Sequence, residues 1–418
     1  MYRIDKIASL LNENVQNNIL PITSRCQARC IFCSHRSNPE KLDIYYTGDI
    51  PFEILKQLIE FLDEDYPIII GESSTRLCEG EPFLHKDFLK IIKSLRERFP
   101  KTKIVITTNG LLLDKAYIEF LKQIENIVLR ISLNSLKHHH ELVKKDFKRP
   151  FLDIIKLLKD ANIETIVSLI YIKEYEDNII NEIKELIKEG IKEIRILKPG
   201  FSKFLGMTFD WPEDDFYKKI DILRENSLIF IEPPELKGLE SSVIGIIKHS
   251  PAYACGLRVG DIIIKIGDYI PLSRVDTFDH LMKSGNTNIL IKRGNSYIEL
   301  SINKKKNEKS GIALDYDISK EDYTKIKDIL EHNGNIATGK LSGSFFKKIF
   351  PEYEGNIISC KNFTFDGNIM ASGLLTLSDI SKCTSKEKDY YIPEIMMDNN
   401  GFDLLGENIS DYPNLLIL

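Results

Sequence analysis

Three cysteines near the start of the chain are the residues best suited to chemistry. Cys26, Cys30 and Cys33 follow the spacing C-x3-C-x2-C, which places three thiols within eight residues. Three soft sulfur ligands suit an iron–sulfur cluster, and a cluster that needs four ligands would keep one iron without a protein ligand. An open iron can bind a substrate or a cofactor directly. The spacing therefore predicts a catalytic cluster rather than an electron carrier.

Two other kinds of site use the same residue types. A zinc site or a redox-active Cys-x2-Cys pair would also need closely spaced thiols. Zinc requires a fourth ligand, for which His35 is the nearest candidate in the sequence. The other cysteines, Cys78, Cys255, Cys360 and Cys383, are scattered along the chain. An odd total of seven, only three of them close together, does not indicate a disulfide framework.

The first half of the chain alternates between strand-like and helix-like segments. Strands are predicted at Ile19–Ser24, Thr75–Glu79, Lys103–Thr108, Ile127–Ser132, Glu164–Ile172 and Glu193–Leu197. Helices are predicted at Pro51–Leu62, Lys86–Arg98, Asp114–Gln123, Phe151–Asp160 and Glu176–Glu189. Six β/α units predict an α/β fold with a parallel sheet curled into a partial (β/α)6 TIM-like barrel. In such barrels the chemistry lies at the C-terminal ends of the strands, and the cysteine loop follows the first predicted strand.

The cysteine spacing, with Phe32 just before the last cysteine, resembles the radical S-adenosylmethionine (radical SAM) superfamily over about residues 15–200. Three further motifs follow at the ends of the second, third and fourth predicted strands: Glu79-Gly80-Glu81-Pro82, Thr108-Asn109-Gly110 and Ser132-Leu133-Asn134-Ser135. The family usually has Gly-Gly-Glu-Pro at the first of these and often Ser-Leu-Asp at the last. Glu79 and Asn134 therefore depart from its pattern.

The resemblance implies a [4Fe–4S] cluster on the three cysteines, with SAM bound at the open iron. Glu81 and the backbone near Gly80 would accept hydrogen bonds from the methionine ammonium, and a glycine permits close backbone approach. The implied SAM pocket consists of Phe32, Glu79, Gly80, Glu81, Pro82, Asn109, Ser132 and Asn134. The implied reaction is reductive cleavage of SAM to a 5′-deoxyadenosyl radical, which abstracts a hydrogen atom from a substrate. An external electron donor, similar to flavodoxin or ferredoxin, is implied as well.

Two residues are candidates for a catalytic role beyond SAM binding. Cys78 lies two residues before Gly80 and is a candidate thiol or hydrogen-atom donor, although a buried cysteine is more often a small hydrophobe. Arg195, with Lys198, ends the sixth predicted strand and could hold an anionic group of substrate or SAM, or form a salt bridge. The run His138–His140 predicts a loop or a helix start, because consecutive helical residues point in different directions.

The second half of the chain begins after Pro199-Gly200 and changes character. Residues 211–230 are predicted to contain a linker helix, and residues 231–316 resemble a PDZ domain. The resemblance rests on a strand before Ser250-Pro251-Ala252, a short helix ending at Gly256, and the Gly260-Asp261 turn into a strand. It implies recognition of a peptide or protein by strand addition. A domain-packing role is the alternative, because residues 233–240 do not match the usual carboxylate-binding loop.

Residues 317–418 are predicted to form a small α/β domain. The segments Thr338–Leu341 and Ala371–Thr376 resemble an uncharacterised family of iron–sulfur oxidoreductase-like proteins, which implies no substrate. The predicted organisation is therefore a barrel over 1–210, the linker, the PDZ-like domain and this C-terminal domain.

Composition narrows the choice of partners. The 418 residues are 43% hydrophobic and 28% charged, with a net charge of −5, which is ordinary for a globular protein and gives no basic field for nucleic acid or membrane. Residues 1–11 are amphipathic rather than a continuous apolar run, so we expect no signal peptide and a cytoplasmic location.

The sequence thus predicts a radical SAM enzyme whose first-choice substrate is a peptide or protein. The alternative is a small molecule in cofactor or metabolite biosynthesis. A second alternative is a non-catalytic iron–sulfur scaffold or interaction protein.

Overall fold

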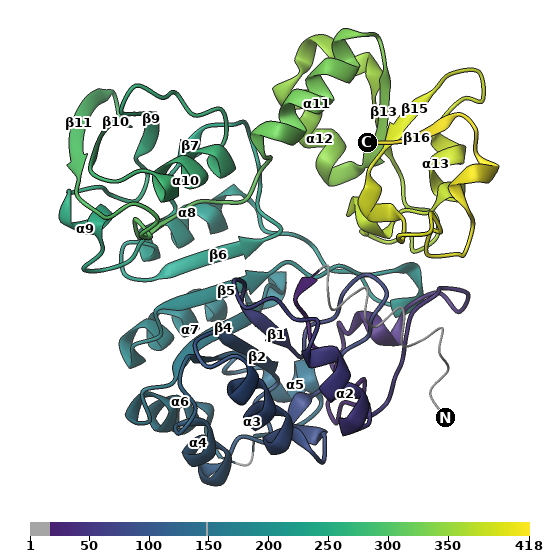
Figure 1. Cartoon of the computed structure of the whole chain (residues 1–418). Helices are drawn as coiled ribbons and strands as arrows, with labels where there is room; N and C mark the ends of the chain where they lie inside the picture. The colour runs from purple at the N-terminus through teal and green to yellow at the C-terminus, as the bar shows by residue number, and fades with distance from the viewer. Residues whose placement is uncertain (1–16, 148) are drawn as a thin grey trace. The chain divides into compact units, whose positions relative to one another are not determined.

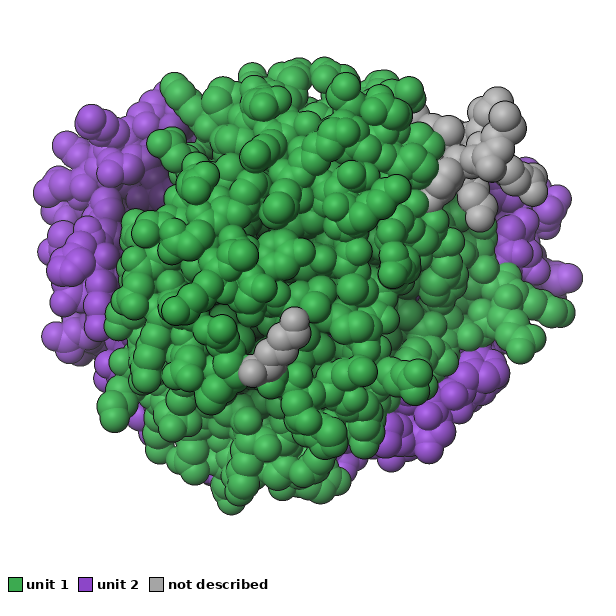
Figure 2. Space-filling view, turned by 90° about the horizontal axis from the view of Figure 1, so that it is seen from below, with its two compact units in different colours: residues 1–199 green, residues 200–418 purple. Residues whose placement is uncertain are grey.

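The computed structural model describes residues 17–147 and 149–418. The chain divides into two compact units, Met1–Pro199 and Gly200–Leu418, which Figure 2 shows in different colours. The stretch 1–11, on which the signal-peptide prediction rests, lies outside the described residues. Within the described ranges, no helix is both long enough and apolar enough to cross a membrane.

A parallel sheet forms the centre of the first unit. Its strands lie in sequence order, and each neighbouring pair is parallel. The strands are β1 (Ile68–Ile70), β2 (Ile104–Thr108), β3 (Ile127–Asn134), β4 (Glu164–Ile170) and β5 (Glu193–Leu197). The predicted parallel α/β architecture is confirmed, and it is consistent with a partial TIM-like core.

Helices follow the strands in the predicted alternation, and Figure 1 shows α3, α4, α6 and α7 flanking the sheet. The helices of this unit are α2 (Phe52–Ile59), α3 (Phe88–Arg98), α4 (Lys115–Leu121), α5 (His139–Val143), α6 (Phe151–Asp160) and α7 (Glu176–Glu189). Helix α7 has the bounds that the sequence predicts. Glu176 and Asp177 suit its positive N-terminal end, and Gly190, with a φ of 97°, ends it in the left-handed region.

The two faces of the sheet differ in chemistry. Residues such as Ile104 and Ile106 are fully buried on one face, and Val105 lies between them on the other. On that second face Val105, Val128 and Ile166 form a small apolar core. Nearer the C-terminal strand ends, the same face carries polar residues, beginning with the paired Thr107 and Arg130. Because successive side chains point to opposite faces of the sheet, one strand can contribute to the core on one face and to a site on the other.

The first predicted strand, Ile19–Ser24, is wrong as a full strand. It makes one parallel bridge, between Ile19 and Ile69, in which Leu20 N donates to Ile69 O at 2.8 Å. The next N–H on that side of the segment, Ile22 N, donates to the Glu79 carboxyl instead, so the ladder stops there.

The second predicted strand, Thr75–Glu79, is also wrong, because these residues lie in the loop after β1. The strand is instead the short isoleucine run of β1, which Gly71 follows. Gly71 has a φ of 80°, and a Cβ there would lie 2.3 Å from Thr107 O, so only glycine fits this exit from the sheet.

The second unit opens with α8 (Asp214–Leu223) and β6 (Leu228–Glu232), followed by a β-rich part with a hydrophobic core of its own. Its strands β7, β9, β10 and β11 form one antiparallel sheet, and β8 pairs with β12. The elements are β7 (Ser241–Ser242), β8 (Gly245–Ile246), α9 (Pro251–Ala254), β9 (Ile262–Ile266), α10 (Arg274–Lys283), β10 (Thr287–Arg293), β11 (Ser296–Ile302) and β12 (Ile312–Ala313). Likeness to a PDZ domain stays a prediction.

The C-terminal part of this unit has a parallel sheet in the order β14-β13-β15-β16. Its elements are α11 (Lys320–Glu331), β13 (Asn335–Gly339), α12 (Lys340–Ile349), β14 (Ile357–Cys360), α13 (Leu377–Cys383), β15 (Tyr390–Ile392) and β16 (Leu415–Ile417). Separate hydrophobic cores lie around Phe345 and around Leu377. The division of the second unit at residues 316 and 317 also stays a prediction.

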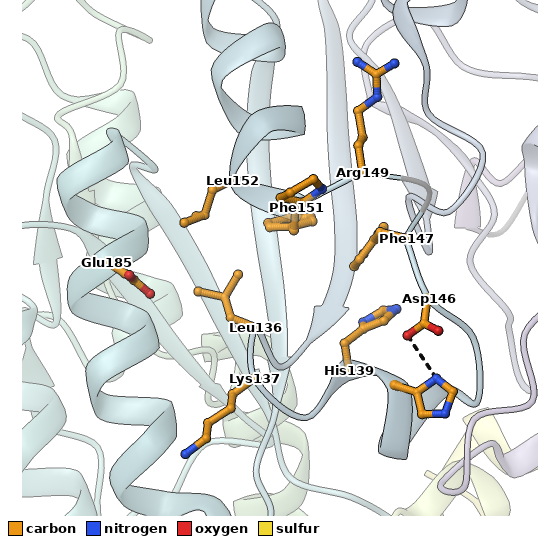
Figure 3. Close-up of a pocket in the computed structure, with 11 residues that line it drawn as sticks. Leu136, Lys137, His139, Asp146, Phe147, Arg149, Phe151, Leu152 and Glu185 are labelled. Carbon is orange, nitrogen blue, oxygen red and sulfur yellow. Dashed lines mark ion pairs between the residues drawn. The ribbon is translucent and has the colours of Figure 1, made fainter.

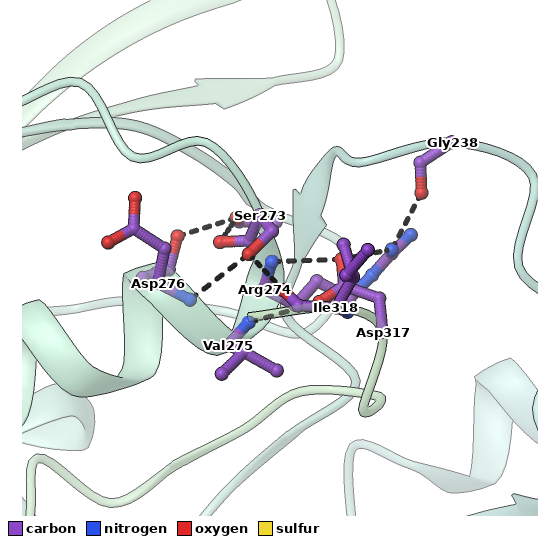
Figure 4. A network of polar contacts seen from close by, with 9 residues as sticks. Gly238, Ser273, Arg274, Val275, Asp276, Asp317 and Ile318 are labelled. Atoms are coloured by element: carbon purple, nitrogen blue, oxygen red, sulfur yellow. Dashed lines mark hydrogen bonds and ion pairs between the residues drawn. The ribbon is translucent and has the colours of Figure 1, made fainter. Parts of the chain in front are cut away.

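A buried carboxylate connects these two parts (Figure 4). Asp317 accepts hydrogen bonds from Arg274 N, Val275 N and Ile318 N at 3.0, 3.1 and 2.8 Å, and it pairs with the Arg274 guanidinium at 3.1 Å. Ser273 Oγ, at the N-cap of α10, donates to Ile318 O at 2.6 Å. The start of α10 is therefore fixed to the segment that leads into α11.

Candidate active site

The cysteine loop is attached to the end of helix α5. Arg29 N donates to Val143 O at 3.0 Å, and Ile31 N donates to Leu142 O at 2.9 Å. Cys33 N closes a turn on Cys30 O at 3.2 Å, and a 3₁₀ helix, Ser34–Arg36, follows. Cys26 is exposed, and Cys30 and Cys33 are half-buried. The three thiols thus lie on a loop that is anchored yet open on one side.

The thiols are close enough to influence one another electrostatically. Burial, reinforced by the neighbouring thiols of Cys33 and Cys26, raises the pKa of Cys30 to about 12, against a small opposing effect of Arg36. Burial also raises the pKa of Cys26, to which Glu81 and Cys33 add. Thiolates in this position need a cation nearby, and a bound metal supplies one.

The donor set of the cysteine loop suits an iron–sulfur cluster. In residues 17–147 and 149–418, no three His, Cys, Asp or Glu side chains meet as they would around one metal ion. A [4Fe–4S] cluster distributes its cysteine ligands over different irons, so its thiols need not converge on one point. Three thiols without a carboxylate or imidazole among them are the soft donors that such a cluster takes.

Glu81 lies inside the protein and joins two of the predicted motifs. Its side chain is 1% exposed, and Oε1 accepts hydrogen bonds from Thr108 Oγ1 at 2.7 Å and Phe83 N at 3.3 Å. Oε2 accepts from Asn109 N at 2.8 Å. Burial raises the pKa of Glu81 to about 7 against these three donors. The carboxyl also caps the 3₁₀ helix Pro82–Leu84, so a structural role is built into this residue.

Asn109 extends the connection to the cysteine loop. Its Nδ2 donates to Cys26 Sγ at 3.7 Å, and its Oδ1 accepts from Gln27 Nε2 at 3.2 Å. The backbone N–H of the same residue binds Glu81, as described above. A short relay therefore runs from Glu81 through Asn109 to Cys26, and it joins residues that are far apart in the sequence.

Gly80 sits where two backbone segments meet. A Cβ at this position would lie 2.0 Å from Arg25 O, which leaves no room for a side chain. Gly80 N donates to Thr23 O at 2.7 Å, and Glu81 N donates to Arg25 O at 2.7 Å. The glycine is therefore required for the motif to lie against the start of the cysteine loop. Pro82 follows as the first residue of the 3₁₀ helix.

The Glu79 carboxyl binds backbone N–H groups that its sequence motif does not indicate. Its side chain is 5% exposed, and Ile22 N donates to its two carboxyl oxygens at 3.2 and 3.3 Å. Burial raises its pKa well above the usual value, although the backbone N–H groups of Ile22, Thr23 and Gly71 lower it. The carboxyl thus replaces hydrogen bonds that the interrupted first strand would have made to a neighbour.

Ser132 and Asn134 lie at the end of β3, as predicted. Asn134 is 4% exposed and has a φ of 67°, and its Nδ2 donates to Ser132 O at 2.9 Å. This left-handed residue creates a bulge in the pairing with β4. Ser132 is half-buried and lies opposite Ser168 on the polar face of the sheet. Phe32, in the cysteine loop, is half-buried as well.

Cys78 lies among the site residues. It is 2% exposed, and burial, followed by the nearby thiol of Cys33, raises its pKa to about 12. Cys78 N donates to Tyr45 O at 3.1 Å. A neutral, buried thiol at this place agrees with either a packing role or hydrogen-atom donation.

A charged layer on the polar face of the sheet was not predicted, apart from Arg195. Glu72 Oε1 accepts from Thr107 Oγ1 at 2.9 Å, forms an ion pair with Arg130, and lies 3.7 Å from Arg195 Nη1. Glu72 thereby connects the loop after β1 to β2, β3 and β5. The sequence signal was a carboxylate two residues after the isoleucine run, at the C-terminal end of a buried strand.

The three consecutive histidines point to different partners, as expected. The ring of His138 stacks on Tyr175 with centroids 3.8 Å apart, His139 is buried with Nδ1 2.7 Å from Leu133 O, and His140 pairs with Asp146 at 3.0 Å.

A groove of about 600 Å³ lies beside His139. In Figure 3 the side chains of Lys137 and Arg149 extend in opposite directions from it, so the groove does not gather positive charge at one point.

The cysteine loop and the motifs around it lie in a segment that matches a known family. The family model described as the radical SAM superfamily matches residues 20–188. This range contains all three cysteines of the loop and the motifs at the ends of β2 and β3. Enzymes of this superfamily use a [4Fe–4S] cluster and SAM.

Individual relatives are distant. GTP 3′,8-cyclase of Synechocystis sp. is 26% identical over 179 residues, which are 42% of this chain and 52% of that protein. GTP 3′,8-cyclase of Paenarthrobacter nicotinovorans is 32% identical over 148 residues, 34% of this chain and 38% of that protein. The match therefore spans about half of these relatives or less. Among solved structures, SuiB of Streptococcus suis bound to S-adenosylmethionine has 18% identity and a TM-score of 0.41, covering 51% of this chain and 49% of that one.

Proposed function

Because residues 20–188 form a radical SAM superfamily domain, we propose that the whole chain is a radical SAM enzyme. In this proposal Cys26, Cys30 and Cys33 hold a [4Fe–4S] cluster, and SAM binds beside it. The observation that carries the proposal is the relay from Glu81 through Asn109 to Cys26, because it connects the cysteine loop to the motif that the family uses for SAM. When bound, the cluster and SAM supply a carbon radical able to abstract a hydrogen atom from a substrate.

The residues of this chain would contribute binding and orientation. Asn109 Nδ2 stabilises negative charge on Cys26 Sγ through its hydrogen bond. Burial raises the pKa values of Cys30 and Cys33, and the charge of Arg36 offsets part of that rise and so favours their thiolates. Glu81, buried and hydrogen-bonded to Thr108 and Asn109, fixes the end of β2 against Gly80. Ser132 and Arg195 line the polar face on which a substrate would lie, next to the proposed cluster.

A small molecule is the substrate class that we propose first. Both relatives above are named as enzymes acting on GTP, and their likeness to this chain falls on the domain that carries the chemistry. At identities of 26% and 32%, this supports a small-molecule reaction more than it supports GTP itself. A purine nucleotide is accordingly the first compound to assay.

A peptide or protein substrate is the second candidate. The β-rich part of the second unit has its own hydrophobic core and supports a recognition module attached to the enzyme. We keep an external flavodoxin- or ferredoxin-like electron donor as part of the proposal. The cytoplasmic location likewise stays a prediction. If the reconstituted protein does not cleave SAM, a non-catalytic iron–sulfur scaffold is the remaining candidate.

The proposal is tested by anaerobic reconstitution with iron and sulfide, followed by incubation with dithionite and SAM. We expect 5′-deoxyadenosine, and we expect its rate of formation to rise when GTP or a mixture of nucleotides is added. A fully loaded protein that yields no 5′-deoxyadenosine contradicts an enzymatic role. Stimulation by peptides but not by nucleotides would favour the second candidate.

A further inference from the structure

Glu79 stands where the radical SAM pattern has a glycine, and its side chain does not face open space. The two carboxyl oxygens accept hydrogen bonds from Ile22 N at 3.2 and 3.3 Å. The backbone N–H groups of Thr23 and Gly71 donate to the same carboxyl. Since Thr23 lies three residues before Cys26, the carboxyl holds the segment that enters the cysteine loop.

The backbone of Glu79 reaches the other end of the same loop. Glu79 N donates to Ser73 Oγ at 3.0 Å, and Ser73 Oγ shares a hydrogen bond with His35 Nε2 at 2.9 Å. His35 follows Cys33 by two residues and lies in the 3₁₀ helix that ends the loop. One residue is therefore connected to both ends of the segment that carries the three thiols.

The entering segment depends on Glu79 because regular strand pairing is absent there. Beyond the bridge between Ile19 and Ile69, the backbone donors of Ile22 and Thr23 have a carboxyl as acceptor in place of a neighbouring strand. The next two backbone hydrogen bonds toward Cys26, from Gly80 N to Thr23 O and from Glu81 N to Arg25 O, hold the same two segments together. Removing the carboxyl would leave buried N–H groups without an acceptor, and the segment would shift to satisfy them.

We propose that Glu79 is a positioning residue for the cluster: it fastens both ends of the Cys26–Cys33 loop and so sets the distance between the thiols and the Gly80-Glu81 turn. The inference rests on the proposed function, because it concerns the cluster and SAM. In this role the Glu79 side chain contacts backbone and not SAM. Its effect on SAM acts through the placement of the loop.

The experiment compares Glu79→Ala, Glu79→Gln and Ser73→Ala with the parent protein, each reconstituted anaerobically. The readouts are iron per chain, the electron paramagnetic resonance spectrum of the reduced cluster with and without SAM, and SAM affinity by equilibrium dialysis. Glu79→Ala is expected to keep its three ligands and bind iron. Its spectrum should broaden, the SAM-induced change should be lost, and SAM should bind about 10- to 100-fold more weakly, as for other residues that orient metal ligands.

The matched variants distinguish a positioning role of Glu79 from a general loss of folding or stability. Glu79→Gln keeps one of the two oxygen acceptors and should give a spectrum between those of Glu79→Ala and the parent, and Ser73→Ala should give a milder form of the Glu79→Ala defect. Glu119→Ala, an exposed glutamate on α4, should match the parent. If Glu79→Ala does not fold, Ser73→Ala decides the matter.

A parent-like spectrum and SAM response in Glu79→Ala, or in Ser73→Ala when that variant decides, overturns the inference. A parent protein that shows no SAM-induced change overturns the proposed function itself, which keeps the two failures distinct.

Discussion

Asn109 and Cys26 are 83 residues apart in the sequence and share a hydrogen bond in the structure. The Nδ2 group of Asn109 donates to Cys26 Sγ at 3.7 Å, while the backbone N–H of Asn109 donates to the buried carboxyl of Glu81. A donor on a ligand sulfur stabilises the reduced state of a cluster, because reduction adds negative charge. With Cys26 as a ligand of the proposed cluster, Asn109 would couple the end of β2 to the electronic properties of that cluster.

Replacement of Asn109 by alanine should lower the reduction potential of the reconstituted cluster. A lost hydrogen bond of about 1 kcal/mol corresponds to a shift of roughly 40 mV for a one-electron couple. The measurement is a redox titration of parent and variant with the same iron content. Asn126→Ala, on a surface turn away from the loop, serves as control and should keep the parent potential. An unchanged potential in Asn109→Ala would show that the contact has no electronic effect.

Loss of one loop cysteine should abolish the cluster. Cys30→Ala is expected to remove the visible absorbance and most of the iron after reconstitution, because two thiols cannot hold the cluster. Cys255→Ala, in the β-rich part of the second unit, keeps the loop intact and should bind iron as the parent does. Equal iron content in both variants would contradict the assignment of the ligands.

The stability of the metal-free protein should depend on pH through Glu81. Burial raises the pKa of Glu81 from 4.5 to about 7, so the folded state binds this proton more tightly than the unfolded state. The resulting contribution is fully present below pH 4.5 and is lost as the pH rises through about 7. It is on the order of 3 kcal/mol.

Glu81→Gln, which is neutral throughout, should flatten this decline in the free energy of unfolding, measured by urea titration at several pH values. Glu79, whose pKa burial also raises, keeps part of the slope in the variant. Glu119→Gln should retain the full slope, and an equally steep decline in Glu81→Gln would refute the assignment.

Glu72 should contribute to stability because it pairs with side chains on two strands. Glu72→Gln weakens its contacts with Arg130 and Arg195, whose side chains are 17% and 21% exposed. We expect a loss of about 1–3 kcal/mol in the free energy of unfolding, measured by urea titration. Glu60→Gln removes the exposed pair with Arg98 and should cost less than about 1 kcal/mol. An equal loss of stability in the two variants would show that the charged layer around Glu72 contributes no more than an exposed ion pair.

Replacement of Asp317 should strongly destabilise the second unit. Its side chain is 0% exposed, and Asp317→Asn would leave Arg274 without its charge partner and disturb three backbone donors. A loss of about 3–5 kcal/mol is expected in thermal or urea unfolding. Asp268→Asn, which weakens a pair between Lys265 and the fully exposed Asp268, is the control and should behave as the parent. A small effect at Asp317 would mean that the two parts are connected mainly by apolar contacts.

Much of the first unit could be predicted from hydrophobic periodicity. Strands β2 to β5 and helix α7 lie where their patterns place them, because long apolar runs and capped amphipathic helices leave few alternatives. The first two strands could not be placed. In the first, the N–H of Ile22 is bound by the carboxyl of Glu79, which is distant in the sequence, and β1 has only three residues, fewer than hydrophobic periodicity resolves.

The site was predictable where residue type alone carries the chemistry. This holds for the cysteine spacing and for the position of Glu81. The contacts of Glu79 with Ile22, and of Glu72 with Arg130, depend on which segments the fold brings together, and no local pattern contains that information. Asn134 was singled out for its side chain, but the structure also gives it a left-handed backbone that bends the end of β3.

The alternation of apolar and polar residues along β2 and β3 has a consequence for how this protein can change. Ile106 and Leu129 face the helices, while Thr107 and Arg130 face the opposite side of the same strands. Substitutions at the second set change the polar face and its contacts with Glu72, while the apolar side chains of the helix-facing core stay the same. Packing residues and polar-face residues therefore occupy alternate positions of one strand, so the polar face can change in evolution while the apolar core is kept.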